Sequence, residues 1–344
     1  MRPRAVTRDN KWGIPAPFPG SEGKTLYVWV EAVLGYVSAT IEYFQKRGEK
    51  EKWREYWFDK DAKSVYFIGK DNIPFHTIIF PALLLATREG YTLPWNVAST
   101  EFLQFEGQKF SKSRRIGVWI DEALQLFPAD YWRYTLLSIR PETKDTNFSW
   151  KIFIEKVNSD LNDTLGNFIH RTLSFINRHF NSAVPKPNKL DERDKRILQS
   201  VRKRTEKIAQ KLEEFKLQAA LRAVMRLSHL GNKYLNEKEP WNTIKTNPQA
   251  SATTLYVAVQ IVKALAITLE PFIPLTAEKL WKLLNLSGNV HEQAWSEATI
   301  PLQPGHKIGK AEPLFRKVEA TEEELPAMLE KARLNIGQSE QFAP

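Results

Sequence analysis

The sequence predicts a partial α/β domain with a parallel sheet, followed by an all-α helical bundle. Up to about residue 115, continuous apolar strands alternate with helices, which is the pattern of a parallel sheet covered on its faces. Beyond Asn147, almost every segment is amphipathic with a helical period and short connections. The predicted strands number three, so we expect only part of a doubly wound sheet.

The elements of the α/β part follow a connector at residues 12–23, which is rich in Pro and Gly and cannot form a helix or a central strand. LYVWV at 26–30 is β-branched and aromatic and predicts a strand, and residues 32–44 then take up a helical rhythm. VYFIG at 65–69 predicts a buried strand that leads into a second helix. NVASTEFLQFEG at 96–107 predicts the third strand.

The bundle is expected to begin at Ser149, which can cap a helix from Trp150 to about Phe180. Its apolar face is predicted to use Val157, Leu161, Leu165, Phe168 and Phe175. Further helices are predicted over residues 190–215, 217–238, 250–269 and 275–284. Residues 301–344 contain scattered Pro and Glu and predict a loosely docked tail.

The composition favours polyanionic partners and argues against several site types. The net charge is +10, and residues 147–344 hold 29 of the 50 basic and 22 of the 40 acidic side chains. A solvated surface explains this excess as well as a nucleic-acid face does. Without cysteine there is no disulfide or zinc–thiolate site, and the six histidines are scattered, so we expect no metal site. The start has no signal core and no stretch approaches ~20 apolar residues, which predicts a cytoplasmic protein without membrane contact.

The segment KFSKSRR at 109–115 carries the clearest chemical signal. It holds four basic side chains and no acidic one, so it should attract phosphate groups. Small serines allow the backbone to approach a triphosphate, and a lysine can neutralise charge that develops during nucleotidyl transfer. A basic surface turn is the alternative explanation of this segment taken alone.

KFSKS resembles the KMSKS loop of class I aminoacyl-tRNA synthetases, in the Phe form of archaeal and eukaryotic methionyl enzymes. VWVEAVLGY at 28–36 and FIGKDNIPFH at 67–76 are similar to two further segments of the methionyl family, in the same order. FPADYWRYTLL, PETKDTNFSW and LGNFIHR resemble the family's link into its anticodon-binding bundle, so the resemblance covers most of residues 9–285. It implies the second half of a Rossmann-type catalytic domain over residues 1–115. A stem-contact segment (116–148), the anticodon-binding domain (149–300) and a tail (301–344) would follow.

The resemblance implies a methionine pocket. Its residues here would be Trp29, Ala32, Val33, Tyr36 and His76. A polarisable thioether packs well against aromatic rings, and a hydroxyl and an imidazole supply oriented polar contacts. Ordinary core packing of the same aromatics is the alternative. The family has Pro where this chain has Val33, so a fixed φ angle is lost from the turn that shapes the pocket.

The resemblance also implies an ATP site that uses ATP with Mg²⁺. Lys109 and Lys112 would be catalytic and stabilise the adenylation transition state. The residues implied to bind ATP are Gly69, Asp71, Leu103, Phe110, Ser111, Lys112 and Ser113. Asp71 could equally cap a helix, because it follows a predicted strand where a helix begins.

In the bundle, the resemblance assigns anticodon reading to three residues. Asn167 and Arg171 are spaced i, i+4 and share one helix face, and Trp241 follows Pro240. In the family, the Asn and Arg positions hydrogen-bond the CAU anticodon and the Trp stacks on a base, as recognition of unpaired RNA generally requires. A solvated polar face with a buried Trp is the alternative.

The family also needs an H-x-G-H motif, and none of the six histidines begins one. We therefore expect a methionine–tRNA ligase portion that works with a separate N-terminal half, which would also carry the family's zinc-bearing insertion. Its partners would be tRNA(Met), methionine, ATP and that half. Little activity is expected from the chain alone, because oriented phosphate contacts are each worth ~10²–10³-fold in rate. A catalytically inactive anticodon-binding module and a truncated fragment are the alternatives.

Overall fold

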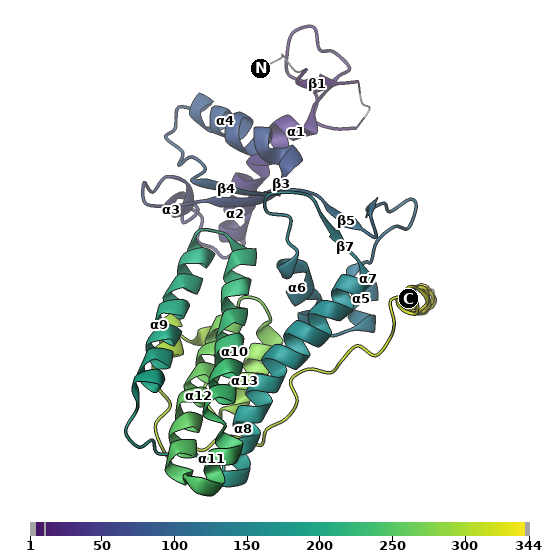
Figure 1. Cartoon of the computed structure of the whole chain (residues 1–344). Helices are drawn as coiled ribbons and strands as arrows, with labels where there is room; N and C mark the ends of the chain where they lie inside the picture. Colours follow the sequence, from purple (N-terminus) through teal and green to yellow (C-terminus); the bar gives the residue numbers. More distant parts are fainter. Residues whose placement is uncertain (1–4, 10–11, 341–344) are drawn as a thin grey trace. The chain divides into compact units, whose positions relative to one another are not determined.

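The computed structural model describes residues 5–9 and 12–340 and divides the chain into two compact units, each described here by itself (Figure 1). The first unit runs to Phe102 and includes residues 142–144. The second comprises Leu103–Pro141 and the chain from Asp145 onward. The parts of the predicted domains at residues 1–4, 10–11 and 341–344 lie outside the described residues.

The first unit is built on a parallel pair of strands. Val65–Gly69 (β3) pairs in parallel with Asn96–Thr100 (β4), with Val65 opposite Asn96 and Gly69 opposite Thr100. The predicted strand at 65–69 and the parallel sheet are thus confirmed. The other elements are β1 (Thr7–Arg8), β2 (Thr25–Leu26), α1 (Val28–Glu31), η1 (Ala32–Leu34), α2 (Gly35–Lys46), α3 (Arg54–Trp57), η2 (Lys70–Asn72), the π-helix η3 (Phe75–Ile79) and α4 (Phe80–Ala86).

The predicted strand at 26–30 is wrong. The strand ends at Leu26, and α1 begins at Val28 after a turn in which the Val30 amide donates to the Tyr27 carbonyl. β2 pairs with β1 over two residues and Thr25 also bridges Pro15, whereas Val28 is 54% exposed. An apolar run of this length suits a strand or a helix, and the strand pairing among the described residues ends at Leu26, where the run turns into α1.

The predicted third strand, 96–107, is two strands. β4 belongs to the first unit, whereas Leu103–Phe105 (β5) opens the second unit and pairs in parallel with Thr146–Phe148 (β7) and antiparallel with Gln108–Lys109 (β6). Ile120–Leu126 (α5) and Ala129–Ser138 (α6) lie between β6 and β7 in the chain. Phe105 stacks on Phe148 with ring centroids 5.7 Å apart, which joins this small sheet to the core of the second unit.

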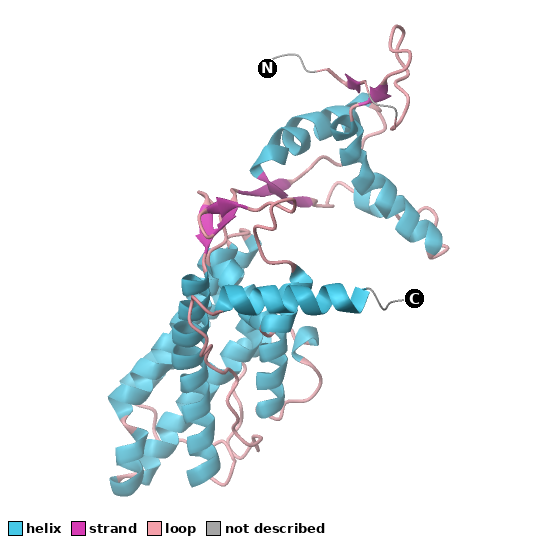
Figure 2. Ribbon diagram, turned by 90° about the vertical axis from the view of Figure 1, so that its right-hand side faces the viewer, coloured by secondary structure: helices cyan, strands magenta, loops and turns pink. Residues whose placement is uncertain are grey.

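The helical bundle is confirmed. Ser149 caps the first helix by accepting a hydrogen bond from the Ile152 amide at 3.3 Å. Val157, Leu161, Leu165 and Phe168 are fully buried as predicted, but Phe175 is only partly buried. The helices are α7 (Trp150–Glu155), the π-helix η4 (Lys156–Gly166), α8 (Asn167–His179), α9 (Glu192–Glu213), α10 (Leu217–Lys238), α11 (Pro240–Thr246), α12 (Pro248–Leu269) and α13 (Pro274–Leu283) (Figure 2).

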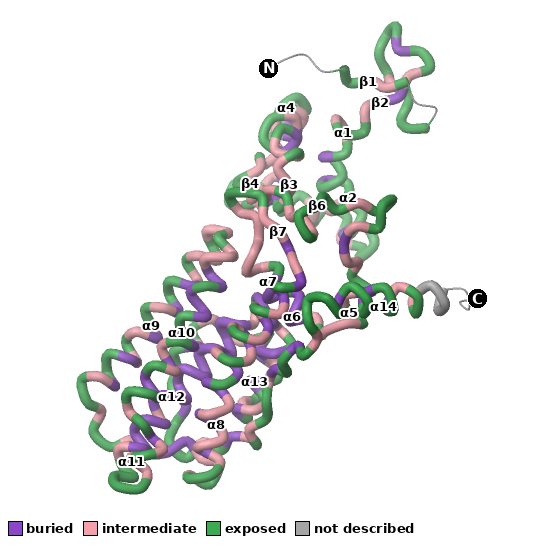
Figure 3. Tube along the Cα trace, turned by 45° about the vertical axis from the view of Figure 1, so that its right-hand side comes forward, coloured by how far each residue is buried: buried purple, intermediate pink, exposed green. Residues whose placement is uncertain are grey.

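α12 is the central helix of the bundle. Almost every side chain from Ser251 to Leu269 is buried, and Figure 3 shows the helix as nearly continuous purple. Within the described part of the chain it is the one helix long and apolar enough to cross a membrane by length and composition, which the sequence reading did not anticipate. Its 94% burial inside the protein is what a core helix requires.

The expectation of a loosely docked tail is wrong for residues 301–336. Leu302, Ile308, Phe315 and Val318 are buried in the core of the second unit. Two short helices, η5 (Val290–Glu292) and η6 (Trp295–Thr299), precede this segment, and α14 (Leu325–Glu340) at its end packs on α5. Isolated apolar residues among Pro and Glu give no periodic signal, although here they are buried one by one against the bundle.

The start of α9 carries a pH-dependent cap. The Asp191 carboxylate accepts hydrogen bonds from Lys238 and from the backbone amides of Asp194 and Arg193, which lowers the pKa of Asp191 to about 2. Because the folded pKa lies below the unfolded value of about 3.9, this stabilisation is present above pH 4 and is lost as the pH falls toward 2.

We therefore expect Asp191→Asn, which keeps the cap but not the charge, to unfold at lower urea concentration than the wild type above pH 4. The difference in unfolding free energy should shrink toward pH 2, as measured by urea titration at several pH values. A difference that stays constant from pH 5 to pH 2 would show that the charge of Asp191 contributes nothing.

Candidate functional site

An aromatic cluster in the first unit gathers most of the residues implied for a methionine pocket. The Tyr36 hydroxyl lies 2.9 Å from His76 Nε2, and His76 Nδ1 lies 2.9 Å from the Asn72 carbonyl oxygen. A carbonyl only accepts, so Nδ1 donates to Asn72, and Nε2 shares its hydrogen bond with the Tyr36 hydroxyl. The His76 ring is therefore held on both sides, and it is buried while Tyr36 is 41% exposed.

The other three residues of this set differ in exposure. Trp29, on α1, packs against Phe75 with ring centroids 5.5 Å apart and is 41% exposed. Ala32 is exposed, and Val33 is buried in the core of the first unit. Glu31, Ala32 and Gly35 around Val33 all have right-handed helical backbone, so the chain accommodates Val33 within a continuous helical turn.

Gly69 and Asp71 lie at the carboxyl end of β3, where parallel sheets commonly bind ligands. Gly69 precedes the short turn η2, and Asp71 is exposed within that turn. η2 has no side-chain cap, so the alternative role of Asp71 as a helix cap is not realised. Beside them, Lys70 forms an ion pair with Glu101 at 2.6 Å.

The KFSKS segment forms a tight hairpin in the second unit. The Ser111 amide donates to the Ile116 carbonyl at 3.0 Å, and the Ile116 amide donates back to Ser111 at 2.9 Å. Arg115 closes the turn with a φ of 54°. Lys112 and Ser113 are exposed at its tip, and Lys109 is at the end of β6. The hairpin thus presents Lys112 on a backbone that is fixed on both sides.

The ATP-binding residues implied by the sequence are divided between the two units. Gly69 and Asp71 belong to the first unit, and Leu103, Phe110, Ser111, Lys112 and Ser113 belong to the second. Leu103 lies in β5, and together with Phe110 it lines an apolar cavity of about 480 Å³. Within the described ranges, no group of three or more His, Asp or Glu side chains is arranged to hold a metal ion.

Phe110 anchors the hairpin against Gly117. Gly117 has a φ of 135°, and a Cβ atom there would lie 2.5 Å from the Phe110 ring. Gly117→Ala should therefore displace Phe110 and loosen residues 108–116, which hydrogen–deuterium exchange would report as faster exchange in that segment. Gly107→Ala is the matched control, because Gly107 has a φ of 75° but open space around it. Equal exchange in the two variants would refute this anchoring role.

The hairpin has a second support, which no sequence pattern indicates. Arg333 on α14 donates to Glu122 at 2.9 Å and to the Gly117 carbonyl at 2.7 Å, and both charged side chains are largely buried. Lys112 and Arg115 of the hairpin line a cavity of about 400 Å³ with Trp119, Glu122 and Arg333. The contact joins residues more than 200 positions apart in the chain, so no local pattern indicates it.

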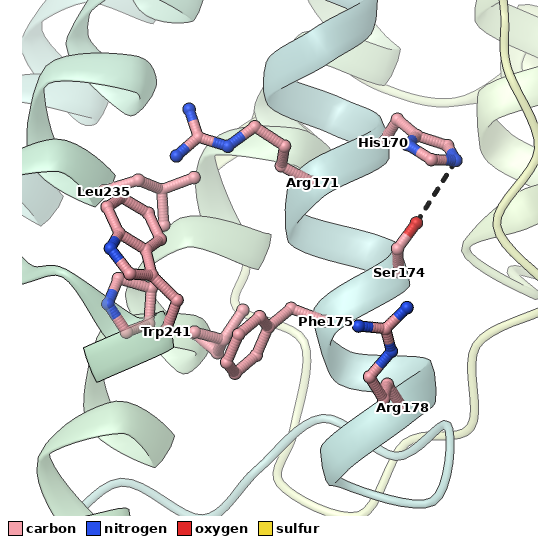
Figure 4. A pocket seen from close by; sticks show the side chains of 9 residues that line it. His170, Arg171, Ser174, Phe175, Arg178, Leu235 and Trp241 are labelled. Atoms are coloured by element: carbon pink, nitrogen blue, oxygen red, sulfur yellow. Dashed lines mark hydrogen bonds between the residues drawn. The ribbon is translucent and has the colours of Figure 1, made fainter. Parts of the chain in front are cut away.

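The bundle contains a pocket between α8 and α11. It has a volume of about 190 Å³ and is lined by Arg171, Trp241, Phe175 and Arg178 among others (Figure 4). The Arg171 guanidinium lies 4.9 Å from the centre of the Trp241 ring and donates to Asn236 Oδ1 at 3.3 Å. A left-handed residue, Glu239 with a φ of 43°, ends α10 and turns the chain into Pro240, which fixes Trp241 in the first turn of α11.

Arg171 has no carboxylate within ion-pair distance among the described residues. Burial lowers the pKa of Arg171, yet a guanidinium remains protonated in proteins. A partly desolvated cation over an indole ring is suited to a planar ligand with hydrogen-bond acceptors. Asn167 is exposed one turn before Arg171 and does not line the pocket.

Sequence reasoning missed three further residues around this pocket. His170 accepts or donates a hydrogen bond with Ser174 at 3.2 Å, and Phe175 and Arg178 follow Arg171 at i+4 and i+7. That spacing places them on the face of Arg171, so it could have indicated their positions. Phe175 was instead predicted to be a core residue.

Comparison with known protein families gives two matches along the chain. A family model described as "tRNA synthetases class I (M)" matches residues 1–173. A second, described as "Anticodon binding domain of methionyl tRNA ligase", matches residues 184–330.

Individual proteins agree with these families. Methionine–tRNA ligase of Thermofilum pendens is 52% identical over 331 residues, which are 96% of this chain and 58% of that protein. That of Korarchaeum cryptofilum is 53% identical over 322 residues, 94% of this chain and 57% of that protein. The solved structure of Mycobacterium tuberculosis methionyl-tRNA synthetase in complex with methionyl-adenylate is 26% identical, with a TM-score of 0.78 over 90% of this chain and 60% of that one. The chain thus spans somewhat more than half the length of the relatives that it matches.

Proposed function

Because the chain belongs to the methionyl-tRNA synthetase family, we propose that it acts as part of a methionine–tRNA ligase, which activates methionine with ATP and transfers it to tRNA(Met). The observation that carries the proposal is the pocket in the bundle. There, a partly buried Arg171, which has no carboxylate partner in the part of the chain that the structure describes, lies over Trp241, at the positions that the resemblance assigns to anticodon reading. Trp241 would stack on a base of the CAU anticodon, and Arg171 and Asn167 would bond its edges.

The hairpin supplies the nucleotide chemistry of this proposal. Lys112 and Lys109 would neutralise charge on the phosphates of ATP, which arrives with Mg²⁺, while adenylate forms. Ser111, Ser113 and Phe110 would shape the loop around the triphosphate. Leu103 would contact the adenine, and Gly69 and Asp71 the ribose. No zinc is assigned to these residues.

The aromatic cluster would hold methionine. The hydrogen bond between the Tyr36 hydroxyl and His76 fixes the orientation of the Tyr36 ring beside the substrate. Trp29, Ala32 and Tyr36 are exposed beside the buried Val33 and His76, and aromatic faces of this kind suit a polarisable thioether.

The printed sequence contains no H-x-G-H motif. Under this proposal, the histidines that bind the ATP phosphates come from residues outside the printed sequence, on the same or on a separate polypeptide. We place the reaction in the cytoplasm, where tRNA is charged. One feature favours the rival view of a non-catalytic anticodon-binding module, namely Val33 in place of the family's Pro.

Methionine-dependent ATP–pyrophosphate exchange separates these proposals. It should be measured with the chain alone and with the portion of the Thermofilum pendens relative that lies outside the matched residues. Exchange with methionine and not with leucine or valine, seen on mixing, supports the ligase. A lack of exchange in every mixture, with binding of tRNA(Met) retained, supports the binding module. Exchange driven by another amino acid alone would contradict both the substrate and the pocket assignment.

A further inference from the structure

α10 carries a basic stripe that the anticodon pocket does not use. Arg222, Arg226, His229 and Lys233 are all exposed, and their spacing of i, i+4, i+7 and i+11 places them on one face of the helix. The residues between them, such as Val224 and Leu227, are buried in the bundle. The four stripe positions include no acidic side chain, and Lys233 at the end of the stripe forms an ion pair with Glu237 at 3.8 Å.

Arg222, Arg226 and His229 of the stripe line a cavity of about 360 Å³ together with Lys156 and Asp160 of η4. Asp160 already accepts a hydrogen bond from Tyr134 at 2.9 Å and one from Lys156 at 3.1 Å. Arg222 is bonded to the neutral side chain of Gln218. Over the described ranges, neither Arg222 nor Arg226 has a carboxylate partner, so their charge is available to an anionic ligand.

The stripe leads to the anticodon pocket along the same helix. Asn236, one turn beyond Lys233, accepts the hydrogen bond from Arg171 at 3.3 Å. Arg222 and Asn236 are 14 residues apart, which corresponds to about 20 Å at ~1.5 Å per residue. That length covers several successive phosphates of a helical stem.

We propose that Arg222, Arg226, His229 and Lys233, with Lys156, form a phosphate track that contacts the backbone of the RNA stem adjoining the anticodon loop, without reading its sequence. The inference rests on the proposed function, since the pocket at one end of the track identifies the ligand as RNA. Phosphate contacts position a nucleic acid and add salt-dependent affinity, whereas base contacts specify it. Of the two explanations for the basic excess of residues 147–344, the track would favour a nucleic-acid face over a solvated surface.

The test compares RNA binding by the full chain and by Arg222→Gln/Arg226→Gln, using fluorescence anisotropy from about 50 to 200 mM KCl. The probe is a hairpin with a CAU loop, and a second hairpin carries UAC in the same positions. We expect roughly 10-fold weaker binding at low salt and a salt slope shallower by about 1 to 2, with the preference for CAU unchanged. A seven-nucleotide single strand with the loop sequence alone should bind both proteins equally.

Lys203→Gln/Lys207→Gln is the matched control, because these exposed side chains have the same i, i+4 spacing on α9 and do not line the cavity. An unchanged slope in the α10 variant, or an equal loss in the α9 control, would overturn the track. A shallower slope in the α10 variant without any preference for CAU in the wild type would uphold the track and contradict the proposed anticodon reading instead. Circular dichroism and thermal unfolding of each variant confirm that the bundle is folded.

Discussion

Replacing Lys112 with methionine is expected to lower the rate of methionine-dependent ATP–pyrophosphate exchange by about 100- to 1,000-fold, in an enzyme whose active site also holds the H-x-G-H histidines. Lys112 is exposed at the tip of a hairpin whose backbone is fixed by the paired bonds between Ser111 and Ile116. A lysine on such a backbone would neutralise phosphate charge with little movement of the loop as the transition state forms. The loss should therefore be in kcat, with the KM for ATP much less affected.

Two variants control for this result. Lys112→Arg keeps the charge and should recover part of the rate, because a guanidinium differs from an ammonium in shape and reach. Lys151→Met removes an exposed lysine of α7 and should leave exchange unchanged. If Lys112→Met retained more than half of the wild-type exchange rate, the hairpin would not be the catalytic loop.

The second large effect is expected at Trp241. Trp241→Ala should weaken binding of a CAU-loop RNA hairpin by about 10- to 100-fold, because base–aromatic stacking is worth ~1–3 kcal/mol. It also removes the ring beneath the Arg171 guanidinium, which then loses its fixed direction. Trp241→Phe should retain most of the affinity. Arg171→Lys should bind with less preference for CAU, because an ammonium group cannot form the paired hydrogen bonds of a planar guanidinium.

Titration by fluorescence anisotropy with the labelled hairpin measures these effects. Trp12→Ala is the control, because Trp12 is 90% exposed in the first unit and is not part of the pocket. Equal affinity of Trp241→Ala and the wild type for the CAU hairpin would remove Trp241 from the anticodon site.

The bundle could be predicted closely because its helices carry strong local signals. The helix predicted over 217–238 has those bounds in α10, where a regular apolar period ends before Pro240. The segment at 26–30 was assigned to the wrong class, because five apolar residues fit either element and the strand pairing among the described residues ends at Leu26. The π-helices η3 and η4 were also missed, since a helical period in the sequence does not distinguish them from α-helix.

In the candidate sites too, some contacts could be predicted and others could not. The contact between Tyr36 and His76 joins two of the residues that the resemblance put in one pocket, and Arg171 and Trp241 do the same in the bundle. The support of the hairpin by Arg333 and Glu122 could not be predicted, because it depends on α14 folding back onto α5.

The most direct test of this account is the anticodon preference of the wild-type chain. Its affinity should be measured for two RNA hairpins of identical stem and composition, one with CAU and one with UAC in the loop. The account predicts at least about 10-fold tighter binding of the CAU hairpin, since the bases that Arg171, Asn167 and Trp241 would read differ between the two. Equal affinity for both hairpins would contradict it.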